Sequence, residues 1–143
     1  MATRLEHANI AVRDVEEMIR FLQLAFPDFE IRGEGKTLLG RHWVHVGNSE
    51  TYIAVNEAAQ DPEPKRAPYS EISGMNHLGY EVSDVEALRE RMLAAGYQES
   101  TVPNAHPERK RIYFYDREGK DWEFVEYKST DPALRNDYTI EGN

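Results

Sequence analysis

Residues 5–16 read LEHANIAVRDVE and residues 75–86 read MNHLGYEVSDVE, so the chain nearly repeats itself after 70 positions. Alignment without a gap pairs His7 with His77, and the Val, Asp, Val and Glu positions that follow are also identical. Self-similarity of this kind indicates that one structural unit occurs twice. It also places one histidine at the same point of each unit, and two equivalent histidines in a small domain suggest a metal site.

The length of the chain limits how its units can fold. A chain of 143 residues is close to the commonest size of one compact domain, and half of it would bury little surface alone. We therefore expect one domain of two repeated units, 1–59 and 73–128, followed by a tail at 129–143. The segment between the units, 60–72, is rich in proline and lacks an apolar pattern, which is typical of a linker.

The charge balance narrows the classes of partner. The chain has 26 acidic and 17 basic residues and a net charge of −9. This argues against a nucleic-acid or membrane partner, because phosphate binding needs clustered lysine and arginine. The run Arg109-Lys110-Arg111 is the basic exception. Such a run is commonly a solvated entrance to a strand, and the alternative is a docking point for an acidic substrate.

The cysteine content and the hydropathy of the sequence indicate the cellular compartment of the protein. The sequence contains no cysteine, which excludes disulfides, thiolate metal ligands and a cysteine nucleophile. Residues 1–4 lead toward a strand without an apolar signal core, and no apolar run approaches the roughly 20 residues of a membrane span. These features favour a cytoplasmic protein.

Each unit is expected to fold as a strand, a helix and then further strands. In the first unit, 5–12 carries β-forming residues and Asp14 is a good N-cap for a helix that Pro27 ends. The second unit repeats this pattern from Asp84, and Gly96 ends its helix. Later strands are expected at 29–32, 38–39 with 43–46, 52–55, 97–102, 111–115 and 122–127.

These features resemble the vicinal oxygen chelate superfamily, which includes glyoxalase I, extradiol dioxygenases and bleomycin-resistance proteins. The resemblance rests on the repeated unit, its first-strand histidines and the segment DREGKDWEF at residues 116–124. It implies an α+β fold in which two βαβββ units form a cupped, half-open, eight-stranded mixed β-barrel, with the helices outside. It does not fix the reaction, because the superfamily hosts many chemistries on one scaffold.

The resemblance also implies a set of metal ligands. They come from the first and last strands of each unit, which assigns this role to His7, His77 and Glu123. In the first unit the last-strand position falls on Ile53 or Ala54, and neither side chain binds a metal. The remaining set, two histidines and one carboxylate, is the facial triad of non-haem Fe(II) oxygenases.

Simpler roles for these residues stay open. Strand histidines can be core residues that are bonded to backbone carbonyls. Glu123 alternates with Trp122 and Phe124, so it points into the cup if those aromatic residues pack beneath the helices. A carboxylate in that place needs a partner, because an unpaired buried charge is costly.

Two further residues are candidates for catalysis. Extradiol dioxygenases carry a tyrosine ten residues before the glutamate ligand, and the resemblance assigns this role to Tyr113. Its hydroxyl would hydrogen-bond a substrate oxygen, whereas the simpler interpretation is packing within a strand. The same enzymes keep an acid–base histidine near the metal, and His106 is the candidate.

The sequence leaves three functions open. The first is an enzyme that uses one divalent metal (Fe, Ni, Zn, Mn or Co) to chelate neighbouring oxygens of a small-molecule substrate. Iron favours ring cleavage with O2, and the other metals favour isomerase, epimerase or lyase chemistry. The second is a metal-free ligand-sequestering protein of the bleomycin-resistance type, and the third is a vestigial site in a regulatory protein. The resemblance also implies a homodimer.

Overall fold

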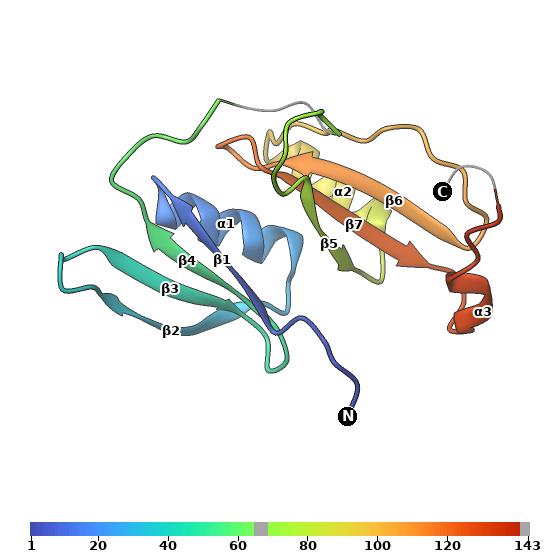
Figure 1. Cartoon of the computed structure of the whole chain (residues 1–143), viewed down its shortest axis with the longest axis horizontal. Coiled ribbons are helices and arrows are strands. Elements are labelled where there is room, and N and C mark those ends of the chain that lie inside the picture. Colours follow the sequence, from blue (N-terminus) through green and yellow to red (C-terminus); the bar gives the residue numbers. More distant parts are fainter. Residues whose placement is uncertain (65–68, 141–143) are drawn as a thin grey trace. The chain divides into compact units, whose positions relative to one another are not determined.

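A computed structural model describes residues 1–64 and 69–140 of the chain. The chain divides into two compact units, Met1–Pro64 and Lys65–Asn143, which Figure 1 shows in blue to green and in green to red. The boundary falls inside the predicted linker, of which residues 65–68 lie outside the described part. Residues 141–143 of the predicted tail also lie outside it.

The first unit is a four-stranded mixed sheet with one helix. The strand order is β1-β4-β3-β2, in which β1 (His7–Val12) runs parallel to β4 (Tyr52–Glu57). The middle strand β3 (His42–Gly47) is antiparallel to β4 and to the edge strand β2 (Glu30–Lys36). Parallel strands cannot be joined by a tight turn, and here α1 (Val15–Ala25) begins the long connection between them.

The helix and one face of this sheet form the core of the first unit. Asp14 caps α1 as predicted, because its carboxylate accepts a hydrogen bond from the Glu17 N–H at 3.0 Å. The fully buried sheet residues alternate along their strands: Val12, Val44, Val46, Ile53 and Val55. Since side chains of a strand point alternately to its two faces, the residues between them form a second face, directed away from the core.

The second unit repeats this plan with one strand fewer. Its strand order is β5-β7-β6, with β5 (His77–Glu81) parallel to β7 (Asp121–Tyr127) and β6 (Arg109–Tyr115) antiparallel to β7. Asp84 caps α2 (Val85–Ala94) by accepting from the Ala87 N–H at 2.9 Å. The helix packs on the sheet through the large, fully buried side chains of this unit: Leu88, Met92, Phe114, Trp122 and Phe124.

The strand predicted at 97–102 is reduced to an isolated bridge between Glu99 and Phe114. A ladder begins there, since the Ser100 N–H donates to the Tyr113 carbonyl at 2.8 Å. The Tyr113 N–H, however, donates to the Thr101 hydroxyl at 2.9 Å instead of to a backbone carbonyl. Two residues later Pro103 has no N–H to donate, so the pairing does not extend.

The described residues do not show the single half-open, eight-stranded barrel that the resemblance implies. The described residues form two separate open sheets, of four and three strands. Within those residues β1 pairs with β4 alone and β5 pairs with β7 alone, so neither sheet closes. The α+β class and the order of strand and helix at the start of each unit are as predicted.

A short helix and polar contacts attach the tail to the second unit. At the end of α3 (Pro132–Arg135), the Arg135 guanidinium donates to Glu81 at 2.7 Å and lies 3.9 Å from the centre of the Tyr127 ring. Tyr138 remains 74% exposed. Along the described parts of the chain, no helix combines the length and the apolar character needed to cross a membrane.

Candidate functional site

Two of the predicted metal ligands meet on the sheet of the second unit. The strand register pairs His77 with Asp121 and Gly79 with Glu123, so the imidazole and the carboxylate share one face. The distance from His77 Nε2 to Glu123 Oε2 is 2.8 Å. Gly79 borders the carboxylate, and a Cβ there would lie 3.4 Å from Glu123 Oε2, at ordinary contact distance.

Strand alternation separates this face from the core. Trp122 and Phe124 are fully buried on the side of α2, whereas the Glu123 side chain keeps 16% of its surface exposed. The Glu123 carboxylate therefore reaches solvent on the opposite face, where a ligand can approach it.

The chemistry of the pair suits a divalent cation. Asn76 Oδ1 lies 2.6 Å from His77 Nδ1, and because an amide oxygen only accepts, Nδ1 carries a proton. One hydrogen lies between His77 Nε2 and the Glu123 carboxylate, and a metal bonded to both atoms would replace it. Imidazole and carboxylate are ligands that Fe, Mn and Zn accept. Within residues 1–64 and 69–140, no three metal-binding side chains are placed to hold one ion, so a third donor is needed.

His7 occupies the corresponding position in the first unit. It begins β1, its side chain is 44% exposed, and its ring stacks on Tyr52 with 4.9 Å between centroids. Tyr52 also stacks against His45 at 4.7 Å, and Trp43 lies next to His45 at 5.2 Å. The outer face of the first sheet is therefore rich in aromatic rings, a feature that sequence reasoning missed.

The strand registers identify the first-unit counterpart of Glu123. Asn9 and Gly79 are equivalent in the repeat, Asn9 pairs with Ala54, and Gly79 pairs with Glu123. Ala54, and not Ile53, therefore occupies the fourth ligand position.

Tyr113 pairs with Glu123 in the register of β6 and β7, and its side chain lies beside the histidine–glutamate pair. Its side chain is buried, and its ring meets the His77 ring edge-on at 5.5 Å. Its hydroxyl is 3.5 Å from that of Tyr69. Burial first, then the Tyr69 hydrogen bond and the Glu123 charge, raise the pKa of Tyr113 above its usual value. At neutral pH the group is therefore a phenol that can donate a hydrogen bond.

His106 is held between its own loop and the tail. It is buried, its Nδ1 accepts from the Glu108 N–H at 3.1 Å, and its Nε2 donates to the Asp137 carbonyl at 3.0 Å. Both ring nitrogens are thus used in structural contacts. The predicted acid–base role of His106 would require the tail contact to open.

The basic run divides between the two faces of β6. Lys110 forms an ion pair with Glu86 of α2. Arg109 and Arg111, two residues apart, are only partly exposed and line a cavity of about 460 Å³. The other residues lining this cavity include Glu123 and Tyr138. The sequence allowed two interpretations of this run. A docking point for an acidic substrate fits Arg109 and Arg111, and a solvated side chain fits Lys110.

Asp121 is a buried carboxylate on the same face that sequence reasoning missed. It is 8% exposed, and its Oδ1 accepts from the Ser100 hydroxyl at 2.6 Å. Among the described residues its Oδ2 has no hydrogen-bond partner. Burial raises its pKa above the usual value. Its position two residues before Glu123 was the available signal, because period-two alternation puts both on one face.

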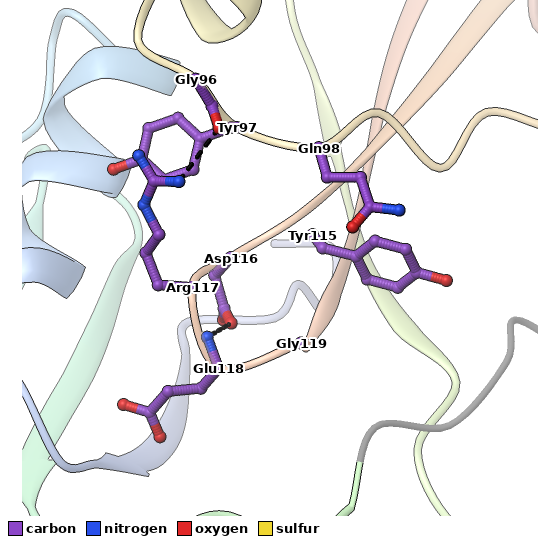
Figure 2. A pocket seen from close by; sticks show the side chains of 8 residues that line it. All are labelled: Gly96, Tyr97, Gln98, Tyr115, Asp116, Arg117, Glu118 and Gly119. Carbon is purple, nitrogen blue, oxygen red and sulfur yellow. Dashed lines mark hydrogen bonds between the residues drawn. The ribbon is translucent and has the colours of Figure 1, made fainter.

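A second cavity, of about 390 Å³, lies at the β6–β7 turn, and its polar groups have structural roles (Figure 2). The Arg117 guanidinium donates to the carbonyls of Gly96 and Ala95 at 3.0 Å, at the end of α2. Asp116 accepts from the backbone N–H groups of Glu118 and Lys120 at 2.9 and 3.0 Å. These contacts fix the turn that leads into β7 and so position Glu123.

Comparison with protein families gives one match. The model of the Glyoxalase/Bleomycin resistance protein/Dioxygenase superfamily matches residues 4–124. A comparison with curated proteins finds no match.

Solved structures show the same fold. The fosfomycin resistance protein FosX from Listeria monocytogenes is 22% identical, with a TM-score of 0.68 over 87% of this chain and 93% of that chain. FosX from Mesorhizobium loti is 21% identical, with a TM-score of 0.66 over 91% and 94%. A glyoxylase/bleomycin resistance protein/dioxygenase domain from Frankia sp. EAN1pec is 18% identical, with a TM-score of 0.70 over 92% and 97%. At these identities the likeness concerns the fold alone.

Proposed function

Because the chain belongs to the Glyoxalase/Bleomycin resistance protein/Dioxygenase superfamily, we propose that it is a divalent-metal-dependent enzyme for a small anionic substrate. Its metal ligands are His7, His77 and Glu123. The substrate carries two neighbouring oxygens, and its anionic group lies against Arg109 and Arg111.

The observation that carries this proposal is the contact of 2.8 Å between His77 Nε2 and Glu123 Oε2 beside an arginine-lined cavity. Glu123 takes part in both features, so a ligand in the cavity would lie next to the metal. A chain with a net charge of −9 gains a local cationic patch there, which favours an anion over a neutral molecule.

The residues of the second unit have separate roles in this proposal. When bound, a divalent metal polarises the neighbouring oxygens of the substrate as a Lewis acid. Arg109 and Arg111 hold the anionic group and orient the substrate. Tyr113 donates its phenolic hydrogen to a substrate oxygen, because its raised pKa keeps it protonated. Tyr69, whose hydroxyl lies 3.5 Å away, orients that phenol.

Relatives suggest a metal and a first ligand to test. A glutamate-to-glutamine mutant of FosX from Listeria monocytogenes was crystallised with Mn(II) and 1S,2S-dihydroxypropylphosphonic acid. That compound has vicinal hydroxyls and a phosphonate, which are the two features that the cavity would recognise. Mn(II) is accordingly the first metal to test, and iron would instead favour ring cleavage with O2.

Metal binding tests the proposal directly. Protein purified without chelator is expected to hold about one metal per site, and His77→Ala and Glu123→Ala are expected to lose it, as is His7→Ala. His42→Ala is the matched control, because His42 also contacts a carboxylate, that of Glu34 at 3.0 Å. A wild-type protein that binds no added Mn(II), Fe(II), Ni(II), Zn(II) or Co(II) would refute the proposal.

Ligand binding tests the anion site separately. With Mn(II) present, 1S,2S-dihydroxypropylphosphonic acid is expected to bind the wild type more tightly than Arg111→Ala. Lys110→Ala is the control, because Lys110 faces α2 and contacts Glu86. Equal affinities for the three proteins would remove the arginine face from the proposal.

The aromatic face of the first unit favours a second candidate function. Rings of His7, Tyr52, His45 and Trp43 follow one another at 4.7 to 5.2 Å, and a planar ligand can stack on such a surface. A metal-free protein that sequesters such a ligand would use this face. It would bind its ligand equally well in the presence of EDTA, which the metal-dependent enzyme would not.

The proposal includes a homodimer, in which His7 reaches the His77–Glu123 pair from the same chain or from the second one. Light scattering after gel filtration is expected to give twice the chain mass of 16.5 kDa. Mixing inactive His7→Ala with inactive Glu123→Ala chains then separates the arrangements. If His7 crosses between chains, a mixed dimer regains one intact metal site.

A further inference from the structure

We infer that Glu6 and Asn76 are positioning residues that direct Nε2 of His7 and Nε2 of His77 toward a metal. This inference rests on the proposed function. It concerns the residue immediately before each histidine, in both copies of the repeat.

In the second unit the contact is short. Asn76 Oδ1 lies 2.6 Å from His77 Nδ1. An amide oxygen accepts and does not donate, so the hydrogen belongs to Nδ1. The ring is thereby turned with Nε2 toward Glu123, at 2.8 Å from Oε2.

In the first unit a carboxylate makes the equivalent contact. Glu6 Oε1 lies 3.0 Å from His7 Nδ1. A carboxylate oxygen accepts this hydrogen bond, so His7 Nδ1 also carries a hydrogen, and Nε2 is the nitrogen left to bind a metal.

The repeat argues against coincidence. Glu6 and Asn76 are equivalent positions, 70 residues apart, and differ in residue type. Neighbouring residues within a strand point to opposite faces and would not touch. Glu6 and Asn76, however, lie just before the strands, which begin at His7 for β1 and at His77 for β5. The same side-chain contact thus forms twice, with two different acceptors.

A hydrogen bond on the distal nitrogen is the usual device for fixing a metal-binding histidine. It selects the tautomer, restricts ring rotation and increases the electron density on the ligating nitrogen. A carboxylate does this more strongly than an amide, so Glu6 is expected to contribute more to affinity than Asn76. Loss of such partners typically weakens metal binding about 10- to 100-fold.

The test measures Mn(II) dissociation constants by electron paramagnetic resonance for wild type, Glu6→Gln, Glu6→Ala and Asn76→Ala. Glu30→Gln is the control, since it removes an equal charge from exposed strand β2. Long-range ¹H–¹⁵N spectra of the zinc-loaded protein report which nitrogen of each histidine binds. Thermal unfolding in EDTA shows whether each variant folds.

We expect Glu6→Ala and Asn76→Ala to bind Mn(II) about 10-fold more weakly or worse, Glu6→Gln to lie between, and Glu30→Gln to match the wild type. Nδ1 should be protonated and Nε2 metal-bound at both histidines. If the wild type binds and His7→Ala and His77→Ala do not, unchanged affinity of the Glu6 and Asn76 variants overturns this inference alone. Binding through Nδ1 also overturns it. A wild type that binds no metal overturns the proposed function with it.

Discussion

The contact between His77 and Glu123 should be measurable as a coupling free energy in the metal-free protein. Truncation of each residue to alanine, and of both together, gives a double-mutant cycle. The contact joins Nε2 and Oε2 at 2.8 Å, and the two side chains are only 20% and 16% exposed. Hydrogen bonds to charged groups contribute about 1.5–3 kcal/mol, and partial exposure to solvent places this one near the lower limit.

The assay is urea unfolding in EDTA, with the free energy of unfolding extrapolated to water for each protein. The control is the His42–Glu34 pair, which has a similar distance of 3.0 Å, but its glutamate is 53% exposed. Since exposed pairs contribute about 0.2–1 kcal/mol, the control cycle should give the smaller coupling. Equal couplings in the two cycles, or a value for His77–Glu123 near zero, would refute the reasoning.

Added metal extends the same experiment. Free metal at about 100 times its dissociation constant stabilises the native state by about 2.7 kcal/mol. A variant that binds tenfold more weakly gains only about 1.4 kcal/mol under the same conditions, by the same relation. Glu123→Ala should therefore lose stability by a larger amount with metal than in EDTA. An identical loss in both conditions would show that the pair holds no metal.

Three further predictions concern individual residues. Tyr113→Phe should leave Mn(II) affinity unchanged and weaken binding of 1S,2S-dihydroxypropylphosphonic acid, because only the donated hydrogen is lost; calorimetry of both ligands checks this. Burial raises the pKa of Tyr80 to about 12, so ionisation opposes folding, and the free energy of unfolding should fall above pH 10; Tyr80→Phe should reduce that fall in urea titrations between pH 9 and 12. Asp14→Ala and Asp84→Ala should each lower stability by about 0.5–2 kcal/mol, since both cap helices; a change below the error of the urea midpoint would contradict the capping role.

The repeat made much of the architecture predictable. Because the 70-residue offset aligns helix starts as well as histidines, it predicted both capping aspartates and the order of strand and helix at the start of each unit. The alternation of Glu123 with Trp122 and Phe124 likewise predicted that the carboxylate would face away from the core. These inferences depend on local periodicity, which the sequence displays directly.

Two features that the sequence did not settle depend on contacts between segments. The strand at 97–102 has suitable residues, but the Thr101 hydroxyl takes the Tyr113 N–H, which no propensity reveals. The choice between Ile53 and Ala54 needed the strand register, because the turns of the two units differ in length. The two faces of Arg109-Lys110-Arg111 follow from strand period two and could have been assigned from sequence.

Sequence reasoning also overlooked the residues before the histidines. Glu6 and Asn76 share no residue type, so an alignment of the repeat by identity skips the position. Their common property, an oxygen that accepts a hydrogen bond from Nδ1, appears only from the side-chain geometry. The two positions therefore share a hydrogen-bond acceptor and not a residue type.

The most direct test of the central claim is X-ray absorption spectroscopy of the protein loaded with one equivalent of Mn(II) or Zn(II). We predict a first shell with two imidazole ligands, which multiple scattering from the rings identifies, together with carboxylate oxygen. His7→Ala and His77→Ala should each reduce the count to one. A shell made of oxygen alone, or a spectrum that neither variant changes, would contradict a metal held by His7, His77 and Glu123.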